Sequence, residues 1–176
     1  GLGTPYWALL LSQSCRSQGY KVGILDILAE KISRDEAVER IQDSNPRLIA
    51  ICVYGENVNS GTTQMSGAIK LANLIKEKNI NIPIAFIGSH VQALPYKVLT
   101  EEKNIDVIFT NEGVYSLWNI LKLKDLTDKK QLESIKGLGF LKDGKPFLTE
   151  PEKIVPNERM DLDLPGYAWD LLPYKD

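Results

Sequence analysis

The stretch LIAICVY at residues 48–54 decides the fold, because it is almost wholly apolar. A strand with so few polar side chains must be covered on both faces, as a central strand of a parallel sheet is covered by helices. The runs PIAFIG at 83–88 and DVIFT at 106–110 have the same character. A further short run, KVGILDI at 21–27, is rich in Val and Ile and ends near an acidic residue. We therefore predict four buried parallel strands.

Helical patterns separate these runs. The first helix contains Trp7 and ends at Gly19, and a possible capping box of Ser33 and Glu36 opens the second. The remaining helices are expected at about 65–78, 93–101 and 114–121. Regular alternation of strands and helices predicts an α/β fold, a flavodoxin-like (Rossmann-like) open parallel sheet with helices on both faces. Because the chain opens at Gly1 with no obvious strand, we expect a first strand upstream.

The sequence changes character after Lys124. Residues 125–149 begin with a charged stretch and then place Asp143-Gly144 between apolar flanks, which predicts a two-residue β-hairpin. Residues 150–176 carry four prolines with little periodicity, which predicts an extended linker. The predicted organisation is an α/β domain at 1–124, an appended helix and hairpin at 125–149, and a linker at 150–176.

Composition excludes some classes of protein. A net charge of -2 argues against a non-specific nucleic-acid binder, which needs a basic surface. No apolar run reaches the roughly 20 residues that a membrane span requires. Cys15 and Cys52 are expected to be buried free thiols in a reducing compartment, so we expect a cytoplasmic protein without nucleic-acid or membrane partners.

Ligands of an open parallel sheet bind at the carboxyl ends of its strands. The loops expected there are residues 26–30, 53–61, 88–94 and 111–114. The second and third are rich in small and amide residues, which allow close approach to the backbone and offer neutral hydrogen bonds. These loops suit a large cofactor decorated with amides better than a bare phosphate, and the sequence contains no Walker phosphate-binding motif.

Four motifs in these loops and in the linker resemble the cobalamin-binding domains that precede radical S-adenosylmethionine (radical SAM) domains. The family's strand that ends in Asp with a nearby Ala-Glu resembles residues 26–30 of this sequence. The family's Gly-Gly-Pro-His with a later Pro resembles residues 87–95. The family's Gly-Glu-Gly-Glu resembles residues 111–114, and its exit motif Leu-Pro-x-x-Ala-Trp-Asp-Leu-Leu-Pro matches residues 164–173. Together the loops and this resemblance give the expected cofactor-binding residues Asp26, Ala29, Glu30, Val53, Tyr54, Gly88, Ser89, His90, Asn111, Glu112 and Gly113.

The resemblance implies part of a larger enzyme. Cobalamin would meet a radical SAM domain of the same chain, which in the family holds a 4Fe-4S cluster through CxxxCxxC, cleaves S-adenosylmethionine and acts on a small-molecule or peptide substrate, most commonly by methyl transfer. This sequence has no such cysteine motif, so no catalytic residue is assigned. In methionine-synthase-like domains the histidine of Asp-x-His-x-x-Gly ligates cobalt. Alignment on Asp26 puts Leu28 and Lys31 at the histidine and glycine, which implies no histidine ligand from this loop and a nucleotide tail buried against the sheet.

Structural alternatives remain open for several residues. His90 could contact the corrin or fix the turn before the following proline, and Glu112 could line the nucleotide tail or favour a helix start. Glu56, Asn57 and Asn59, with Tyr54 and Thr63 nearby, could touch the corrin amides or form a solvated loop. Trp7, Met65 and Trp118 are expected to be packing residues. The alternative function is a flavodoxin-like binding or regulatory module that has lost cobalamin, which the departures at Asn111 and Val114 favour.

Overall fold

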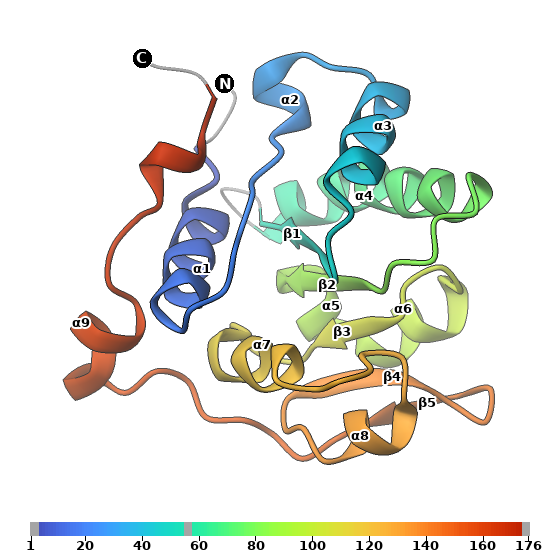
Figure 1. Ribbon diagram of the computed structural model, residues 1–176. Helices are drawn as coiled ribbons and strands as arrows, with labels where there is room; N and C mark the ends of the chain where they lie inside the picture. The colour runs from blue at the N-terminus through green and yellow to red at the C-terminus, as the bar shows by residue number, and fades with distance from the viewer. Residues whose placement is uncertain (1–3, 55–57, 174–176) are drawn as a thin grey trace.

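The apolar runs predicted from the sequence form one side of a five-stranded sheet (Figure 1). The computed structural model describes residues 4–54 and 58–173, without the side chains of 58–63. Strand β1 (Ile49–Val53) pairs in parallel with β2 (Ile84–Gly88), which pairs in parallel with β3 (Val107–Phe109). Every residue of β2 and β3 is buried. The buried central position predicted from the sequence is confirmed for β2 and β3, whereas β1 is the edge strand of the described sheet and is only partly buried. The carboxyl ends of the three strands meet at one edge of the sheet.

The predicted hairpin continues this sheet. Strands β4 (Leu138–Lys142) and β5 (Lys145–Leu148) are antiparallel, and β4 pairs in an antiparallel direction with β3. The turn residues Asp143 and Gly144 have φ values of 52° and 77°. Positive φ at both positions is what a type I′ turn requires, so the Asp-Gly signal is confirmed. The resulting sheet is mixed, with strand order β1-β2-β3-β4-β5.

Helices cover both faces of the sheet, as expected for an α/β fold (Figure 1). Ile84 and Phe86 of β2 belong to a core cluster with Val38 and Ile75, while Ala85 and Ile87 belong to the cluster on the opposite face. The described helices are α1 (Tyr6–Ser17), α2 (Ile27–Glu30), α3 (Arg34–Ser44), α4 (Val58–Glu77), α5 (Ser89–Ala93), α6 (Pro95–Glu101), α7 (Val114–Leu121), α8 (Lys129–Glu133) and α9 (Met160–Asp163), with single 3₁₀ turns at Asn157–Arg159 and Trp169–Leu171. None of these is long and apolar enough to cross a membrane.

The prediction of a β-strand at residues 21–27 is wrong. Residues 21–26 are extended, and Val22 and Leu25 pack against opposite core clusters, which is the alternation of a strand lying in the plane of the sheet. The segment nevertheless belongs to none of the five strands, and Ile27 already begins α2. A strand requires a hydrogen-bonded partner. In a flavodoxin-like order that partner is the first strand expected from the sequence, and no segment among the described residues fills its place.

The helix predicted at 93–101 begins two residues later, at Pro95, and a separate short helix, α5, precedes it. Helix α5 ends at Ala93, Leu94 leaves the helical region with φ -130° and ψ 52°, and Pro95 begins α6. Proline disfavours a helical conformation in the residue before it and is well placed at the first position of a helix. The break therefore follows from Pro95.

The segment after β5 returns across α7 and α1, and we call residues 150–173 the exit segment. The backbone N–H of Ala168 donates to the carbonyl oxygen of Leu9 in α1 at 3.2 Å, and Arg16 pairs with Asp170 at 2.8 Å. Ala168 is fully buried. The exit segment thus runs along the first helix (Figure 1), and the domain limits predicted from the sequence stay predictions.

Candidate cofactor site at the carboxyl ends of the strands

Val53 and Gly88 lie opposite each other where β1 and β2 end. A Cβ atom on Gly88 would lie 2.2 Å from the carbonyl oxygen of Val53, far inside any allowed contact. Glycine is therefore required here by the close approach of the two backbones. Ser89 and His90 follow at once in α5, and both are half-buried. The predicted residues Val53, Gly88, Ser89 and His90 thus gather at one edge of the sheet.

A chain of polar and aromatic contacts crosses this edge. The Gln92 amide donates to the Tyr54 hydroxyl at 3.0 Å, which connects α5 to the residue that follows β1. The Tyr54 and Trp7 rings stand edge to face, with centroids 6.1 Å apart and planes at 68°. The Trp7 indole N–H donates to the carbonyl oxygen of Glu112, after β3, at 3.1 Å. We call these four residues the edge network, because they join the ends of β1, β2 and β3 to α1.

The loop after β3 is organised by its own side chains. The Asn111 carboxamide oxygen accepts from the N–H of Gly113 at 2.8 Å, and Gly113 has φ 85°, which a residue with a Cβ rarely adopts. The same carboxamide donates to the carbonyl oxygen of Glu152 at 2.9 Å. Glu112 accepts from the N–H of Val155 at 2.7 Å. Asn111 and Glu112, both predicted cofactor residues, therefore hold the exit segment.

Asp26, Ala29 and Glu30 form a local group of contacts at α2. The Asp26 carboxylate caps the helix by accepting from the N–H of Ala29 at 3.1 Å, and Glu30 accepts from the N–H of Asp26 at 3.1 Å. Glu30 also pairs with Arg40 of α3 at 2.7 Å. These contacts lead from α2 towards α3, and none of them connects the group to the edge network.

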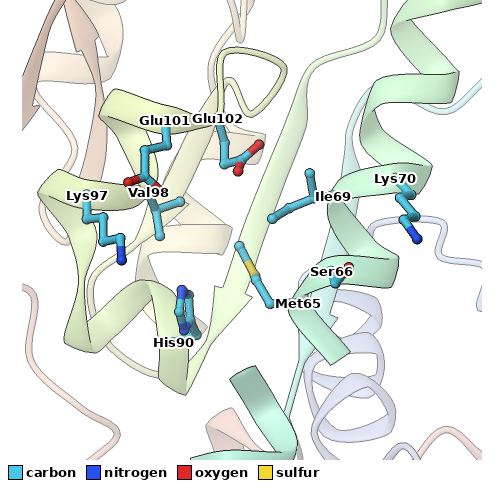
Figure 2. Close-up of a pocket in the computed structure, with 9 residues that line it drawn as sticks. All are labelled: Met65, Ser66, Ile69, Lys70, His90, Lys97, Val98, Glu101 and Glu102. Atoms are coloured by element: carbon cyan, nitrogen blue, oxygen red, sulfur yellow. The ribbon is translucent and has the colours of Figure 1, made fainter. Parts of the chain in front are cut away.

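His90 lies at one end of a pocket of about 400 Å³ between α4, α5 and α6 (Figure 2). Apolar side chains form part of its wall, and charged side chains of both signs surround them. The lining residues are Met65, Ile69, Val98, Ser66, His90, Lys70, Lys97, Glu101 and Glu102. The pocket lies on the sheet face covered by α4 and α6, away from Trp7 and α1.

Burial keeps the Tyr54 phenol of the edge network and two nearby thiols neutral at physiological pH. Burial raises the pKa of Tyr54 to about 12. Burial likewise raises the pKa of the free thiols of Cys15 and Cys52 to about 12. In the described ranges, 4–54 and 58–173, no group of three His, Cys, Asp or Glu side chains could hold a metal ion. The edge can therefore offer neutral hydrogen bonds and aromatic surface, which is the donor set that an amide-decorated cofactor needs.

Sequence reasoning missed two members of the edge network, Trp7 and Gln92. The helical spacing of Trp7 predicts a packing residue, and Gln92 is one of several polar residues in its loop. The available signal was position, since the start of a helix in an open α/β sheet lies near the carboxyl ends of the strands. Glu56 and Asn57 lie outside the described residues, and nothing is described of the side chains of Asn59 and Thr63.

The fold and the edge network define an α/β domain built to hold a ligand at the carboxyl ends of its parallel strands. The chain belongs to the B12-binding domain family, because the model of that family, the B12 binding domain, matches residues 1–121. The family predicted from the strand-end motifs is thereby confirmed.

Two similar proteins extend the comparison. The chain is 27% identical over 175 residues to an uncharacterized methyltransferase of Pyrococcus horikoshii, PH0819, and this match covers 97% of the chain and 34% of the relative. The solved structure of OxsB, a cobalamin-dependent S-adenosylmethionine radical enzyme with aqua-cobalamin bound, superposes with a TM-score of 0.70 at 18% identity. That match covers 94% of this chain and 22% of OxsB. The chain is therefore similar to one domain of proteins several times its length.

Proposed function

We propose that this chain binds cobalamin at the carboxyl ends of β1, β2 and β3 as the cofactor domain of a larger radical SAM enzyme. The observation that carries the proposal is the family match over residues 1–121. The neutral groups of the edge network fit it, since the corrin ring carries amide side chains that neutral donors and acceptors can bind. Cobalamin supplies a cobalt-bound group for transfer, and this chain's part is to hold and orient the corrin.

The catalytic part of the proposal concerns chain beyond these residues. The relatives are a methyltransferase and a cobalamin-dependent radical enzyme, each much longer than this chain. We infer that a radical SAM domain with its 4Fe-4S cluster and S-adenosylmethionine faces the bound corrin, and that a methyl group is transferred to a small-molecule or peptide substrate. The exit segment supports this inference because it leads back along α1.

Retention of corrin colour tests cobalamin binding directly. The chain is incubated with hydroxocobalamin, passed through a desalting column and scanned for corrin absorbance. Retained absorbance in a stoichiometric amount is expected. Ser89→Trp, which adds bulk directly after β2, should abolish it, whereas Lys124→Trp, at an exposed position in the loop after α7, should not. Circular dichroism confirms that each variant is folded, and loss of colour already in the unsubstituted chain would overturn the proposal.

A second candidate function is a related domain that no longer binds cobalamin. The observation in its favour is that Asn111 and Glu112 already use their side chains to hold the exit segment. The same experiment separates the two functions, because this alternative predicts a folded protein that retains no corrin.

A further inference from the structure

Three aromatic rings form a cluster on the surface where the exit segment meets the start of α1. Tyr6, Tyr167 and Trp169 contact one another in pairs, with ring centroids between 5.3 and 6.2 Å apart. These residues, which we call the aromatic cluster, are nevertheless 55%, 43% and 51% exposed. Tyr and Trp side chains are enriched in protein interfaces, because they bury a large apolar area on contact. The aromatic cluster is therefore a candidate contact surface.

The backbone beneath the aromatic cluster is fixed, so its rings are held outward. Ala168, which lies between the two exit-segment rings, is fully buried, and its N–H donates to a carbonyl oxygen of α1 at 3.2 Å. The ion pair of Arg16 with Asp170 joins the same stretch to α1 at 2.8 Å. Because a buried residue anchors the chain between them, Tyr167 and Trp169 are directed away from the core. Their exposure is thus a property of the packed exit segment.

Exposed apolar side chains concentrate in the exit segment. Among the side chains that the structure describes, nine large hydrophobic ones are exposed, and five of these nine lie in this one segment. The five are Ile154, Met160, Leu162, Tyr167 and Trp169. One side of the exit segment packs on α1 and α7, and the other presents apolar groups to solvent. This pattern is expected of a segment that lies between two packed bodies.

The size of this surface decides between the partners that could cover it. Three half-exposed rings leave about 300 Å² to bury, and the other exposed apolar residues of the segment raise the total to about 600 Å². Separate protein molecules in a stable complex bury about 800 Å² on each partner. Domains of one polypeptide bury about 300 to 750 Å² on each side, because the tether supplies a high effective concentration. The surface therefore fits a tethered domain better than a second copy of this chain.

The relatives of this chain have further polypeptide that could dock here. The match covers 34% of PH0819 and 22% of OxsB. The place of the aromatic cluster is also suitable, since Tyr6 directly precedes Trp7, the member of the edge network in α1. A domain docked on the cluster would stand beside the carboxyl ends of the strands, where the cofactor is proposed to bind.

We propose that the aromatic cluster is the docking surface for the part of the longer polypeptide that follows the exit segment. The inference rests on the proposed function, since it assigns the contact between the cofactor domain and the domain after it. The docked face of that domain is expected to be apolar, because the cluster offers three rings and little charge. The contact holds the two domains together beside the cofactor edge and uses no residue of the edge network.

Hydroxyl-radical footprinting tests the docking contact. Mass spectrometry gives the oxidation rates of Tyr6, Tyr167 and Trp169 in this chain and in the full-length protein. An effective concentration of about 1 mM against a dissociation constant of about 0.1 mM leaves about a tenth of the molecules undocked. The aromatic cluster should therefore be oxidised about tenfold more slowly in the full-length protein. Tyr96 of α6, 59% exposed, is the matched control and should be oxidised at the same rate in both.

Substitutions in the full-length protein show whether the rings themselves make the contact. Trp169→Ala should raise the oxidation rate of Tyr167 to the rate found in this chain with the same substitution. Tyr96→Ala should leave the protection of the cluster unchanged. Circular dichroism checks that each variant is folded, and if Trp169→Ala does not fold, the protection of the cluster in the unsubstituted proteins decides.

The outcomes separate this inference from the proposed function. Equal oxidation of the aromatic cluster in the two proteins would overturn the inference, even if both proteins retain corrin colour. Protection that appears in this chain alone as its concentration is raised would show that a second copy covers the cluster, and would also overturn it. Protection in a full-length protein that retains no corrin would support the docking contact and overturn the proposed function.

Discussion

Gly88 shows how a single missing side chain positions the candidate site. The carbonyl oxygen of Val53 occupies the space where any Cβ on residue 88 would lie, at 2.2 Å. We expect Gly88→Ala to lower the free energy of unfolding by about 2 kcal/mol, because β1 and β2 must separate at the edge where they end. Urea unfolding measures this. Gly23→Ala is the matched control, since a Cβ there meets no atom within 4 Å. Equal stabilities of the two variants would contradict the expected crowding.

Asn111 and Glu112 mark the limit of sequence reasoning at the residue scale. Their place after β3 followed correctly from the run DVIFT and from the family motif. Their partners did not, because Glu152 and Val155 lie 41 and 43 positions away in a segment with no periodic pattern. The departure from the family's glycine at residue 111 has a physical account in these contacts. Asn111 closes the turn onto Gly113 and also holds the exit segment, which glycine could not do.

At the scale of the element, the sequence predicts the conformation that a segment prefers, but not whether a partner strand lies beside it. The central strands and the hairpin were recoverable because apolar runs and the Asp-Gly turn are local signals. Residues 21–26 carry an equally local signal and have the alternation of a strand, yet they form no ladder. The edge network was out of reach for a related reason, because Trp7, Tyr54, Gln92 and Glu112 come from four segments that only the fold brings together.

The exit segment is fastened by a buried carboxylate at the end of α9. Asp163, 3% exposed, accepts from Arg159 at 3.0 and 2.9 Å and from the Tyr115 hydroxyl of α7 at 2.6 Å. Its backbone carbonyl oxygen accepts from Ser14 of α1 at 2.6 Å. The hydrogen bonds from Arg159 and then Tyr115 hold the pKa of Asp163 below its ordinary 3.8. The ionised carboxylate therefore joins α9 to α7.

This linkage fixes the sign of a pH effect. Because the folded pKa lies below the unfolded one, the stabilisation is complete well above pH 3.8 and is lost as the pH falls through the lower folded value. Asp163→Asn should lower the free energy of unfolding by about 2 kcal/mol at pH 7. The difference in unfolding free energy between this variant and the unsubstituted chain should become smaller below pH 4. Urea unfolding from pH 7 to pH 3 measures both. Asp161→Asn, which changes an exposed residue of the same helix, should have nearly the same free energy of unfolding as the unsubstituted chain at every pH. If Asp163→Asn lowered this free energy equally at every pH, the carboxylate would have no ionic role.

At the scale of the whole molecule, one domain is similar to about a third of PH0819 and about a fifth of OxsB. The family match fixes the class of cofactor, whereas the mode of binding depends on side chains particular to this chain. Leu28, at the position aligned with the cobalt-ligating histidine, is 64% exposed on α2. The whole sequence contains one histidine, His90, which lines the pocket beside α4 and α6. Within this chain, axial ligation by an imidazole could therefore come only from His90.

Electron paramagnetic resonance of the bound cob(II)alamin form tests this ligation. We expect a spectrum without nitrogen superhyperfine splitting, because Leu28 provides no donor and because we expect the nucleotide tail to lie against the sheet, with its dimethylbenzimidazole base away from cobalt. The spectrum of His90→Ala should be the same. Protein labelled with ¹⁵N-histidine distinguishes the two results that would contradict this prediction. A splitting that changes from three lines to two on labelling would show that His90 ligates cobalt. A splitting that the label leaves unchanged would show that the dimethylbenzimidazole base stays on cobalt and would contradict burial of the nucleotide tail against the sheet.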